Sequence, residues 1–305
     1  MALPAEELGI LRSDLQLYSF NSACHTGGEM KISIIVPIGN MDDWKVCEQS
    51  IVRAITAYKG DVEAELLPCW DLEHKGAWTA RNEGLDKATG DWIAWVDCDD
   101  VVELDWFCEI ANAIESHADV DVIQFDAIEV KKGIERPLRY WKNGDVSGDA
   151  FSRELLRNDG MPAWLWTRVF RRKLFEGKRF AGHVLEDYRM FLMILPHVGC
   201  VWSVGKSLYR YIRHGHGLSN YLQRTDSREL VEELRGLVGE LPEEWLEDGW
   251  IGFALTMADV AFHSNVDNGA KSVVRKLLLK VLADRWVPFR LKLKCILSAF
   301  GVKCR

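Results

Sequence analysis

The stretch GDWIAWVDCDD, residues 90–100, places three carboxylates directly after a short apolar run. A run of this kind, bounded by glycine on one side and polar residues on the other, is typical of a buried strand. Two similar runs precede it, at 31–40 and 62–70, and apolar residues at helical spacing predict helices over 42–60 and 79–90. Alternation of strands and helices indicates an α/β protein with a mostly parallel sheet.

The acids after the third strand are the first candidate site, because ligands bind beyond the carboxyl ends of the strands in such sheets. In an extended segment Asp97 and Asp99 would project to the same side, where two carboxylates suit one divalent cation. The alternative is that the acids cap a helix predicted over 102–117. One acid would suffice for capping, whereas three adjacent acids repel one another unless a cation offsets them. We therefore favour a metal or ligand site.

Composition excludes several classes of protein. The chain has 305 residues, 48% of them hydrophobic and 28% charged, which fits one large domain or two small ones. A net charge of −8 argues against nucleic-acid binding. No apolar run approaches the length of about 20 residues that spans a bilayer. Eight cysteines without a CxxC pair, and no evident signal peptide, favour a reducing, cytoplasmic location.

Three segments together resemble the successive motifs of the family 2 glycosyltransferases. They are KISIIVPIGN, GAWTARNEGLDKATGDWIAWVDCDD and VLEDYRMF. The resemblance implies the GT-A fold, a Rossmann-like, mostly parallel sheet with flanking helices, and a nucleotide-diphospho-sugar donor, foremost a UDP-sugar. It also implies a divalent cation, Mn²⁺ or Mg²⁺, with Asp97 near the ribose, Asp99 closest to the cation and His214 as a further ligand.

The resemblance also predicts contacts to the donor nucleotide. The residues expected there are Pro37, Asn40, Asp71, Arg81, Asp97, Arg213 and His216. The alternative for Arg81 is a surface ion pair on its short helix, and the alternative for the segment LYRYIRHGHGLSN is a plain surface loop. Pro68 and Cys69 stand where most members carry acids that meet the base, so Asp71 would substitute only through a rearranged loop.

A second carboxylate pair, Glu186 and Asp187, precedes an apolar run with helical spacing. Helix capping is one explanation. In inverting members of the family the aspartate is the general base on the acceptor hydroxyl, so the resemblance predicts Asp187 as base and Glu186 as its neighbour on the acceptor. Trp164 and Trp166 offer flat faces for an acceptor sugar, with burial in the core as the alternative.

The expected organisation is an N-terminal extension over 1–29, a catalytic domain over 30–220 and a C-terminal helical region over 221–305. The catalytic domain would divide into a nucleotide half, 30–130, and an acceptor half, 131–220. Residues 271–305 carry ten Lys or Arg against one acid, among apolar residues at helical spacing. This tail predicts either a helical subdomain or peripheral attachment to the inner face of the membrane through anionic lipid.

These features predict a metal-dependent, inverting glycosyltransferase. It would move a sugar from its donor to a glycan or lipid-linked acceptor, in bacterial cell-surface polysaccharide synthesis. The alternative is a degenerate GT-A scaffold that binds nucleotide or glycan without turnover, because a fold can persist without its chemistry. The altered segment at Pro68 and Cys69 favours this alternative, whereas the intact aspartates favour the enzyme.

Overall fold

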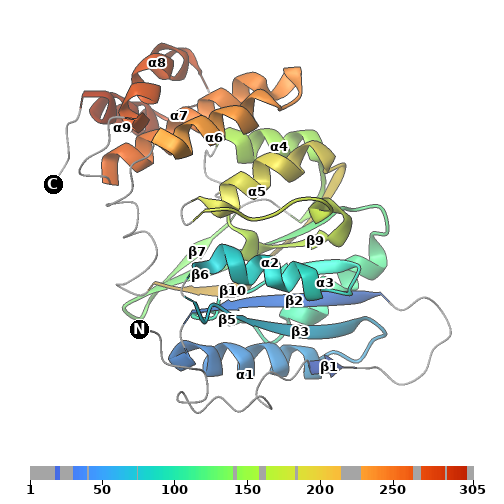
Figure 1. Ribbon diagram of the computed structural model, residues 1–305. Coiled ribbons are helices and arrows are strands. Elements are labelled where there is room, and N and C mark those ends of the chain that lie inside the picture. The colour runs from blue at the N-terminus through green and yellow to red at the C-terminus, as the bar shows by residue number, and fades with distance from the viewer. Residues whose placement is uncertain are drawn as a thin grey trace. The chain divides into compact units, whose positions relative to one another are not determined.

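The protein is described by a computed structural model, drawn in Figure 1. The described residues are 18–20, 30–39, 41–73, 75–139, 143–157, 163–182, 185–213, 228–263, 269–285 and 287–300. Asn40, His214 and His216, which the sequence nominated for the donor site, lie outside these ranges, as do most of residues 1–29.

One mixed sheet organises the described strands. They are β1 (Tyr18–Phe20), β2 (Lys31–Ile38), β3 (Glu63–Trp70), β4 (Trp92–Trp95), β5 (Val101–Val102), β6 (Val122–Lys131), β7 (Ile134–Leu138), β8 (Gly144–Ser147), β9 (Arg168–Arg171) and β10 (Cys200–Ile212). Their order is β1-β3-β2-β4-β9-β6-β10-β5, with β7 paired to β6 and β8 to β10. The three predicted strands β2, β3 and β4 are mutually parallel, as are β6 and β10, while β9 runs antiparallel between β4 and β6. The predicted α/β class is confirmed.

The helices follow the apolar periodicity of the sequence. They are α1 (Met41–Ala57), α2 (Ala77–Lys87), α3 (Trp106–Ser116), α4 (Gly148–Arg157), α5 (Glu186–Ile194), α6 (Arg228–Gly239), α7 (Leu246–His263), α8 (Gly269–Ala283) and α9 (Phe289–Phe300). The third begins four residues later than predicted, because Val101 and Val102 pair with β10 as the short strand β5. The alternative explanation, that the acids cap this helix, is therefore wrong.

Side chains of β2 alternate between two helical layers. Ile32, Ile34 and Val36 belong to one apolar cluster with α1 and α3. On the other face, α2 lies so close to Ile35 that a Cβ added at Gly84 would clash with its side chain. Gly84 therefore permits close packing of helix on sheet.

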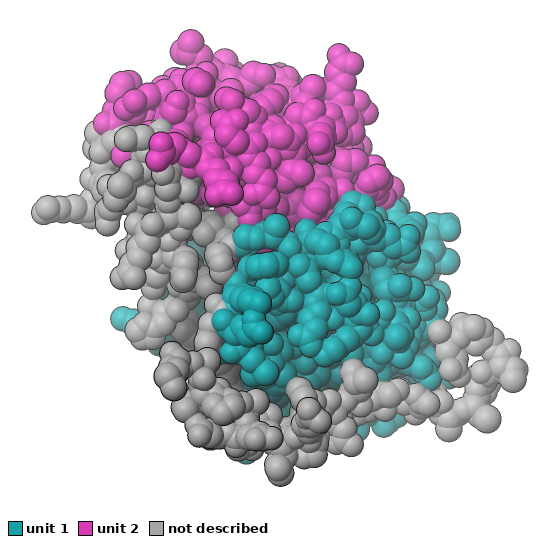
Figure 2. Space-filling view, viewed as in Figure 1, with its two compact units in different colours: residues 1–145, 164–183, 200–213 teal, residues 146–163, 184–199, 214–305 magenta. Residues whose placement is uncertain are grey.

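The chain divides into two compact units built from interleaved segments, coloured separately in Figure 2. The first comprises 1–145, 164–183 and 200–213, and the second 146–163, 184–199 and 214–305. This division differs from the contiguous one predicted, because α4 and α5 pack with the C-terminal helices α6 and α7. The N-terminal segment also contributes to the first unit, since Tyr18–Phe20 pairs antiparallel with β3.

The second unit is helical, and its tail packs within it. Arg275 of α8 donates a hydrogen bond to the carbonyl of Ala299 in α9, 2.6 Å away, and Ser298 donates one to the carbonyl of Ala258 in α7, 3.0 Å away. Such contacts support the predicted helical subdomain. Among the helices in the described ranges, none combines the length and apolar composition that a membrane crossing requires.

Candidate functional site

The acidic segment forms a turn at the carboxyl end of β4. The amide of Asp100 donates to the carbonyl of Asp97, 3.1 Å away, which closes the turn around Cys98 and Asp99. The sequence had suggested an extended segment here, and that prediction is wrong. The carboxylates of the turn differ in exposure as a result: Asp99 is exposed, Asp97 is half-buried and Asp100 is buried.

Arg81 of α2 holds Asp97 from one side. Its guanidinium Nη2 lies 3.3 Å from Asp97 Oδ1, and its side chain is only 6% exposed. It also lies over the ring of Phe180, 5.8 Å from the centroid. Asn82 exchanges two hydrogen bonds with the backbone of Phe180, both 2.9 Å. The surface ion pair considered for Arg81 is therefore wrong, because this arginine is buried against the turn.

Tyr209 of β10 binds the turn through its hydroxyl group. Its hydroxyl donates to Asp100 Oδ2 at 2.9 Å and accepts the amide hydrogen of Asp97 at 3.0 Å. The amide of Ile212 donates to Asp100 Oδ1 at 2.7 Å. Asp100 therefore anchors the turn to β10.

Burial shifts the pKa values of the two residues that anchor the turn, Asp100 and Tyr209. Burial, together with the charge of Asp97, raises the pKa of Asp100 well above its usual value. Burial and the charge of Asp100 likewise raise the pKa of Tyr209, which keeps its hydroxyl protonated as a donor. Neither role was evident from the sequence, because Tyr209 lies more than a hundred residues after the turn.

An aromatic stack adjoins the anchor. Trp166 lies between Trp164 and Tyr209, with ring centroids 4.8 and 4.5 Å away, and Tyr211 is 5.2 Å from Trp166. Trp166 is 4% exposed and belongs to the core, whereas Trp164 is half-buried. The arrangement favours Trp164 over Trp166 as a surface for an acceptor sugar.

Arg168 is a second residue that sequence reasoning missed. It is fully buried, and it donates to the carbonyl of Trp164 and to the side-chain oxygen of Gln124 at 3.0 Å. A buried cation is costly unless its donors are satisfied, so these bonds fix the backbone that carries Trp164. In the sequence, only the position of Arg168 in a run of basic residues indicated this role. Such a run is equally consistent with an exposed surface.

The ends of β2 and β3 supply the other predicted nucleotide contacts. Pro37 is buried within β2, in register with Cys69 of β3. Asp71 follows β3, and its carboxylate accepts hydrogen bonds from the amides of Lys75 at 2.8 Å and Gly76 at 2.6 Å. Asp71 thus closes the loop before α2. Its role toward a nucleotide stays a prediction.

Arg213 directly follows β10. It is exposed, and its guanidinium lies 3.2 Å from Glu129 Oε1. A pair this exposed is worth little energetically, so an anionic ligand would compete with Glu129 for it. The phosphate contact at Arg213 stays a prediction.

Glu186 and Asp187 belong to the second unit, in the first turn of α5. Both are half-buried, and the residue at the N-cap position, Leu185, supplies no side-chain hydrogen bond to the helix. The preceding residue, Leu185, adopts the left-handed conformation with φ 57°, which is strained for leucine. Strain of this kind concentrates at functional sites, where the surrounding structure maintains it.

The carboxylates of the turn fit one kind of metal site. In the described part of the chain, His, Cys, Asp and Glu side chains nowhere gather in a group of three or more that would enclose a metal. Mg²⁺, however, is commonly held by one or two carboxylates together with substrate phosphates. Asp99, exposed at the tip of the turn, and Asp97 beside it would supply oxygen ligands of that type.

Comparisons with known proteins bear on this arrangement. A sequence model described as Glycosyl transferase family 2 matches residues 71–177, which contain the acidic turn, Arg81 and Trp164. The Escherichia coli (strain K12) protein called uncharacterized glycosyltransferase YibD is 26% identical over 239 residues, covering 66% of each chain. Glycosyltransferase GlyA of Streptococcus pneumoniae is 24% identical over 216 residues, covering 61% of this chain and 31% of that protein. The chain thus spans slightly under two thirds of one relative and about a third of the other.

Solved structures show the same fold. The structure of S. aureus TarS 1–349 in complex with UDP-GlcNAc matches with a TM-score of 0.57 and 16% identity, covering 89% of this chain and 88% of that one. The structure of TarS 1–349 in complex with UDP matches with a TM-score of 0.55 and 15% identity, covering 88% and 89%. At such identities the likeness concerns the fold.

Proposed function

We propose that this chain is a family 2 glycosyltransferase and that it transfers a sugar from a nucleotide-diphospho-sugar to a glycan or lipid-linked acceptor. UDP is the first candidate nucleotide, because TarS, which shares the fold, binds UDP-GlcNAc and UDP. We place the reaction in the synthesis of a bacterial cell-surface polysaccharide.

The single observation that carries the proposal is the construction of the acidic turn. Asp99 is presented at the carboxyl edge of the parallel strands, while Arg81 holds Asp97 and Tyr209 holds Asp100. Two buried supports, one from helix α2 and one from strand β10, are more than a surface loop requires. They favour a preorganised site for a ligand that brings its own negative charge.

The chemistry explains why such a site is needed. As the glycosidic bond breaks, negative charge develops on the departing diphosphate. A bound divalent cation, Mn²⁺ or Mg²⁺, would neutralise that charge, and Asp99 with Asp97 would hold it. In the same proposal Asp187 takes the proton from the acceptor hydroxyl while the hydroxyl oxygen bonds the anomeric carbon and the bond to the diphosphate breaks, a single displacement that inverts the configuration. Glu186 and Trp164 orient the acceptor.

One observation favours the second candidate, a scaffold that binds without turnover. Asp71, the acid available to meet the nucleotide base, already accepts two backbone amides, and Pro68 and Cys69 occupy the end of β3. A donor would then bind through its diphosphate, with weak selection of the base.

A panel of nucleotide sugars separates the two candidates. Each donor is incubated with Mn²⁺ or Mg²⁺, with and without EDTA, and released nucleotide is measured beside the thermal shift caused by the bare nucleotide. The enzyme predicts cation-dependent release from at least one donor. Thermal stabilisation by nucleotide without release from any donor would support the scaffold instead.

The C-terminal helices supply a candidate membrane contact. Leu279, Phe289 and Phe300 are 81%, 79% and 71% exposed among the basic residues of α8 and α9. Large apolar side chains beside cations suit the headgroup region of an anionic bilayer. Sedimentation with anionic and neutral vesicles tests this attachment, and equal, negligible binding to both would exclude it.

A further inference from the structure

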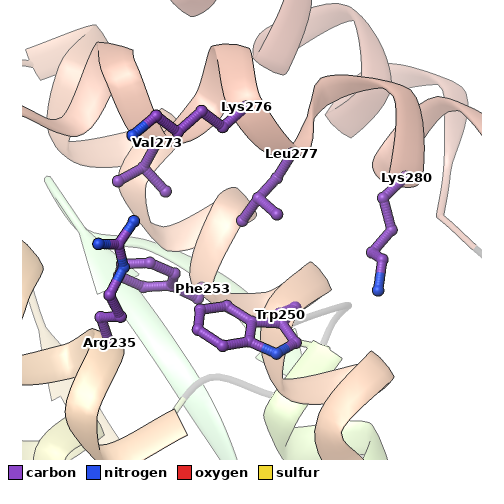
Figure 3. Close-up of a pocket in the computed structure, with 7 residues that line it drawn as sticks. All are labelled: Arg235, Trp250, Phe253, Val273, Lys276, Leu277 and Lys280. Atoms are coloured by element: carbon purple, nitrogen blue, oxygen red, sulfur yellow. The ribbon is translucent and has the colours of Figure 1, made fainter. Parts of the chain in front are cut away.

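A pocket opens within the second unit, between α6, α7 and α8 (Figure 3). Its volume is about 320 Å³, at the lower end of the range for small-molecule sites. The lining residues are Arg235, Trp250, Phe253, Val273, Lys276, Leu277 and Lys280. All of them lie outside residues 71–177, the segment that the family model matches.

The body of the pocket is apolar. Trp250 and Phe253 come from successive turns of α7, and their rings meet edge to face at 5.9 Å. Val273 and Leu277 face them from α8 in Figure 3. Phe253 and Val273 are buried, so these walls are fixed by packing. A surface of this kind favours hydrocarbon or aromatic groups.

Cations stand around this apolar body. In Figure 3 the head groups of Arg235 and Lys276 lie toward one end, and Lys280 stands at the other. Arg235 lies 3.5 Å from Glu232 on its own helix, a pair too exposed to neutralise it strongly. Neither Lys276 nor Lys280 forms an ion pair within the described ranges. The end of the pocket to which Arg235 and Lys276 turn therefore offers two cationic head groups to an anion.

We propose that the pocket binds a phosphate ester joined to an apolar group. A phosphate ester carries a charge of about −1.5 to −2 and three acceptor oxygens, which matches an arginine and a lysine better than a single carboxylate does. The apolar group would lie between Trp250 and Leu277. A soluble phosphate ester and a phospholipid headgroup with its first methylenes share this chemistry.

The proposal does not depend on glycosyl transfer. The acidic turn and its supports belong to the first unit, whereas every lining residue belongs to the second. Binding at the pocket is measured directly, without a sugar donor, so its failure would leave the proposed transfer untouched. Loss of transfer would equally leave the binding result standing.

Calorimetric titration of the full chain with hexyl phosphate, 1-hexanol and inorganic phosphate tests the chemistry. Hexyl phosphate should bind at least about tenfold more tightly than either of the others, because each of those lacks one half of the recognised group. Its affinity should also fall as salt is raised, since exposed charges are screened. Equal affinity for hexyl phosphate and 1-hexanol would overturn the proposal.

Paired variants locate the binding. Lys276→Gln should weaken hexyl phosphate binding about tenfold, whereas Lys271→Gln, the same change on the same helix outside the pocket, should not. Leu277→Asn and Leu279→Asn form the matching apolar pair, since Leu279 is exposed and does not line the pocket. Thermal unfolding verifies that each variant folds. Equal losses within either pair would place the ligand elsewhere and refute the proposal.

Vesicles identify the source of the ligand. The Lys276→Gln and Lys271→Gln variants are sedimented with phosphatidylcholine vesicles that contain or lack phosphatidic acid. If only Lys276→Gln loses binding to phosphatidic acid, the pocket takes a phospholipid headgroup. If both variants bind vesicles as the wild type does while Lys276→Gln loses hexyl phosphate, the pocket takes a soluble ester.

Discussion

Tyr209→Phe removes the hydroxyl that joins the acidic turn to β10 and keeps the aromatic ring. The hydroxyl donates to Asp100 at 2.9 Å and accepts from the amide of Asp97 at 3.0 Å. The lost bond to Asp100 is worth about 1 kcal/mol, and the amide of Asp97, left without its acceptor, costs about 1–3 kcal/mol more. The free energy of unfolding should therefore fall by about 2–4 kcal/mol, while the stack with Trp166 persists.

Urea unfolding of the variant measures this loss, with Tyr211→Phe as the matched control. Tyr211 lies in the same strand and stack, but its hydroxyl forms no hydrogen bond within the described residues, so its loss should cost less than about 0.5 kcal/mol. Because the turn carries Asp99, cation-dependent nucleotide affinity should also fall in Tyr209→Phe and not in the control. Equal stability of the two variants would refute the anchoring role.

Three further predictions address other parts of the chain. Asp187→Asn should lower turnover by about 100-fold or more with donor affinity unchanged, and near-normal turnover would remove the base from this position. Burial alone would raise the pKa of Glu65, but hydrogen bonds from Ser33, Thr89 and Lys31 lower it below its usual value near 4.5. The ionised carboxylate therefore stabilises the fold fully above pH 4.5, and this contribution is lost as the pH falls through the lowered pKa. The stability gap between wild type and Glu65→Gln, about 2 kcal/mol at pH 7, should accordingly shrink in acid urea titrations, and a constant gap would contradict this. Gly252→Ala should destabilise the second unit by about 3 kcal/mol or more, because the added methyl group would meet the carbonyl of Leu156, and unchanged thermal unfolding would disprove that close approach.

The parallel strands could be predicted because each is a short apolar run followed by turn residues. β2, β3 and β4 lie where the sequence placed them, and the acids follow β4 as expected. β5 could not be predicted, because two valines pair only in the presence of β10, which lies a hundred residues further along the chain. Local patterns carry no information about such partners.

The site was predicted less completely than the fold. The sequence nominated the three acids together, but only the structure separates buried Asp100 from exposed Asp99. Arg81 was predicted to contact the donor, with a surface ion pair as the alternative, and nothing local indicates that Asp97 and Phe180 enclose it. Burial is a property of the assembled fold. Sequence patterns therefore do not indicate whether a charged residue that forms an ion pair is buried or exposed.

The most direct test of the central claim compares Asp99→Ala with Asp119→Ala, a matched change at another exposed aspartate of the first unit. Nucleotide release from the preferred donor is measured for both variants and the wild type, with Mn²⁺ and with EDTA. The account predicts that EDTA abolishes wild-type release and that Asp99→Ala loses it with Mn²⁺ present, while Asp119→Ala behaves as the wild type. Wild-type release that is unaffected by EDTA, or Asp99→Ala release equal to that of Asp119→Ala, would contradict it.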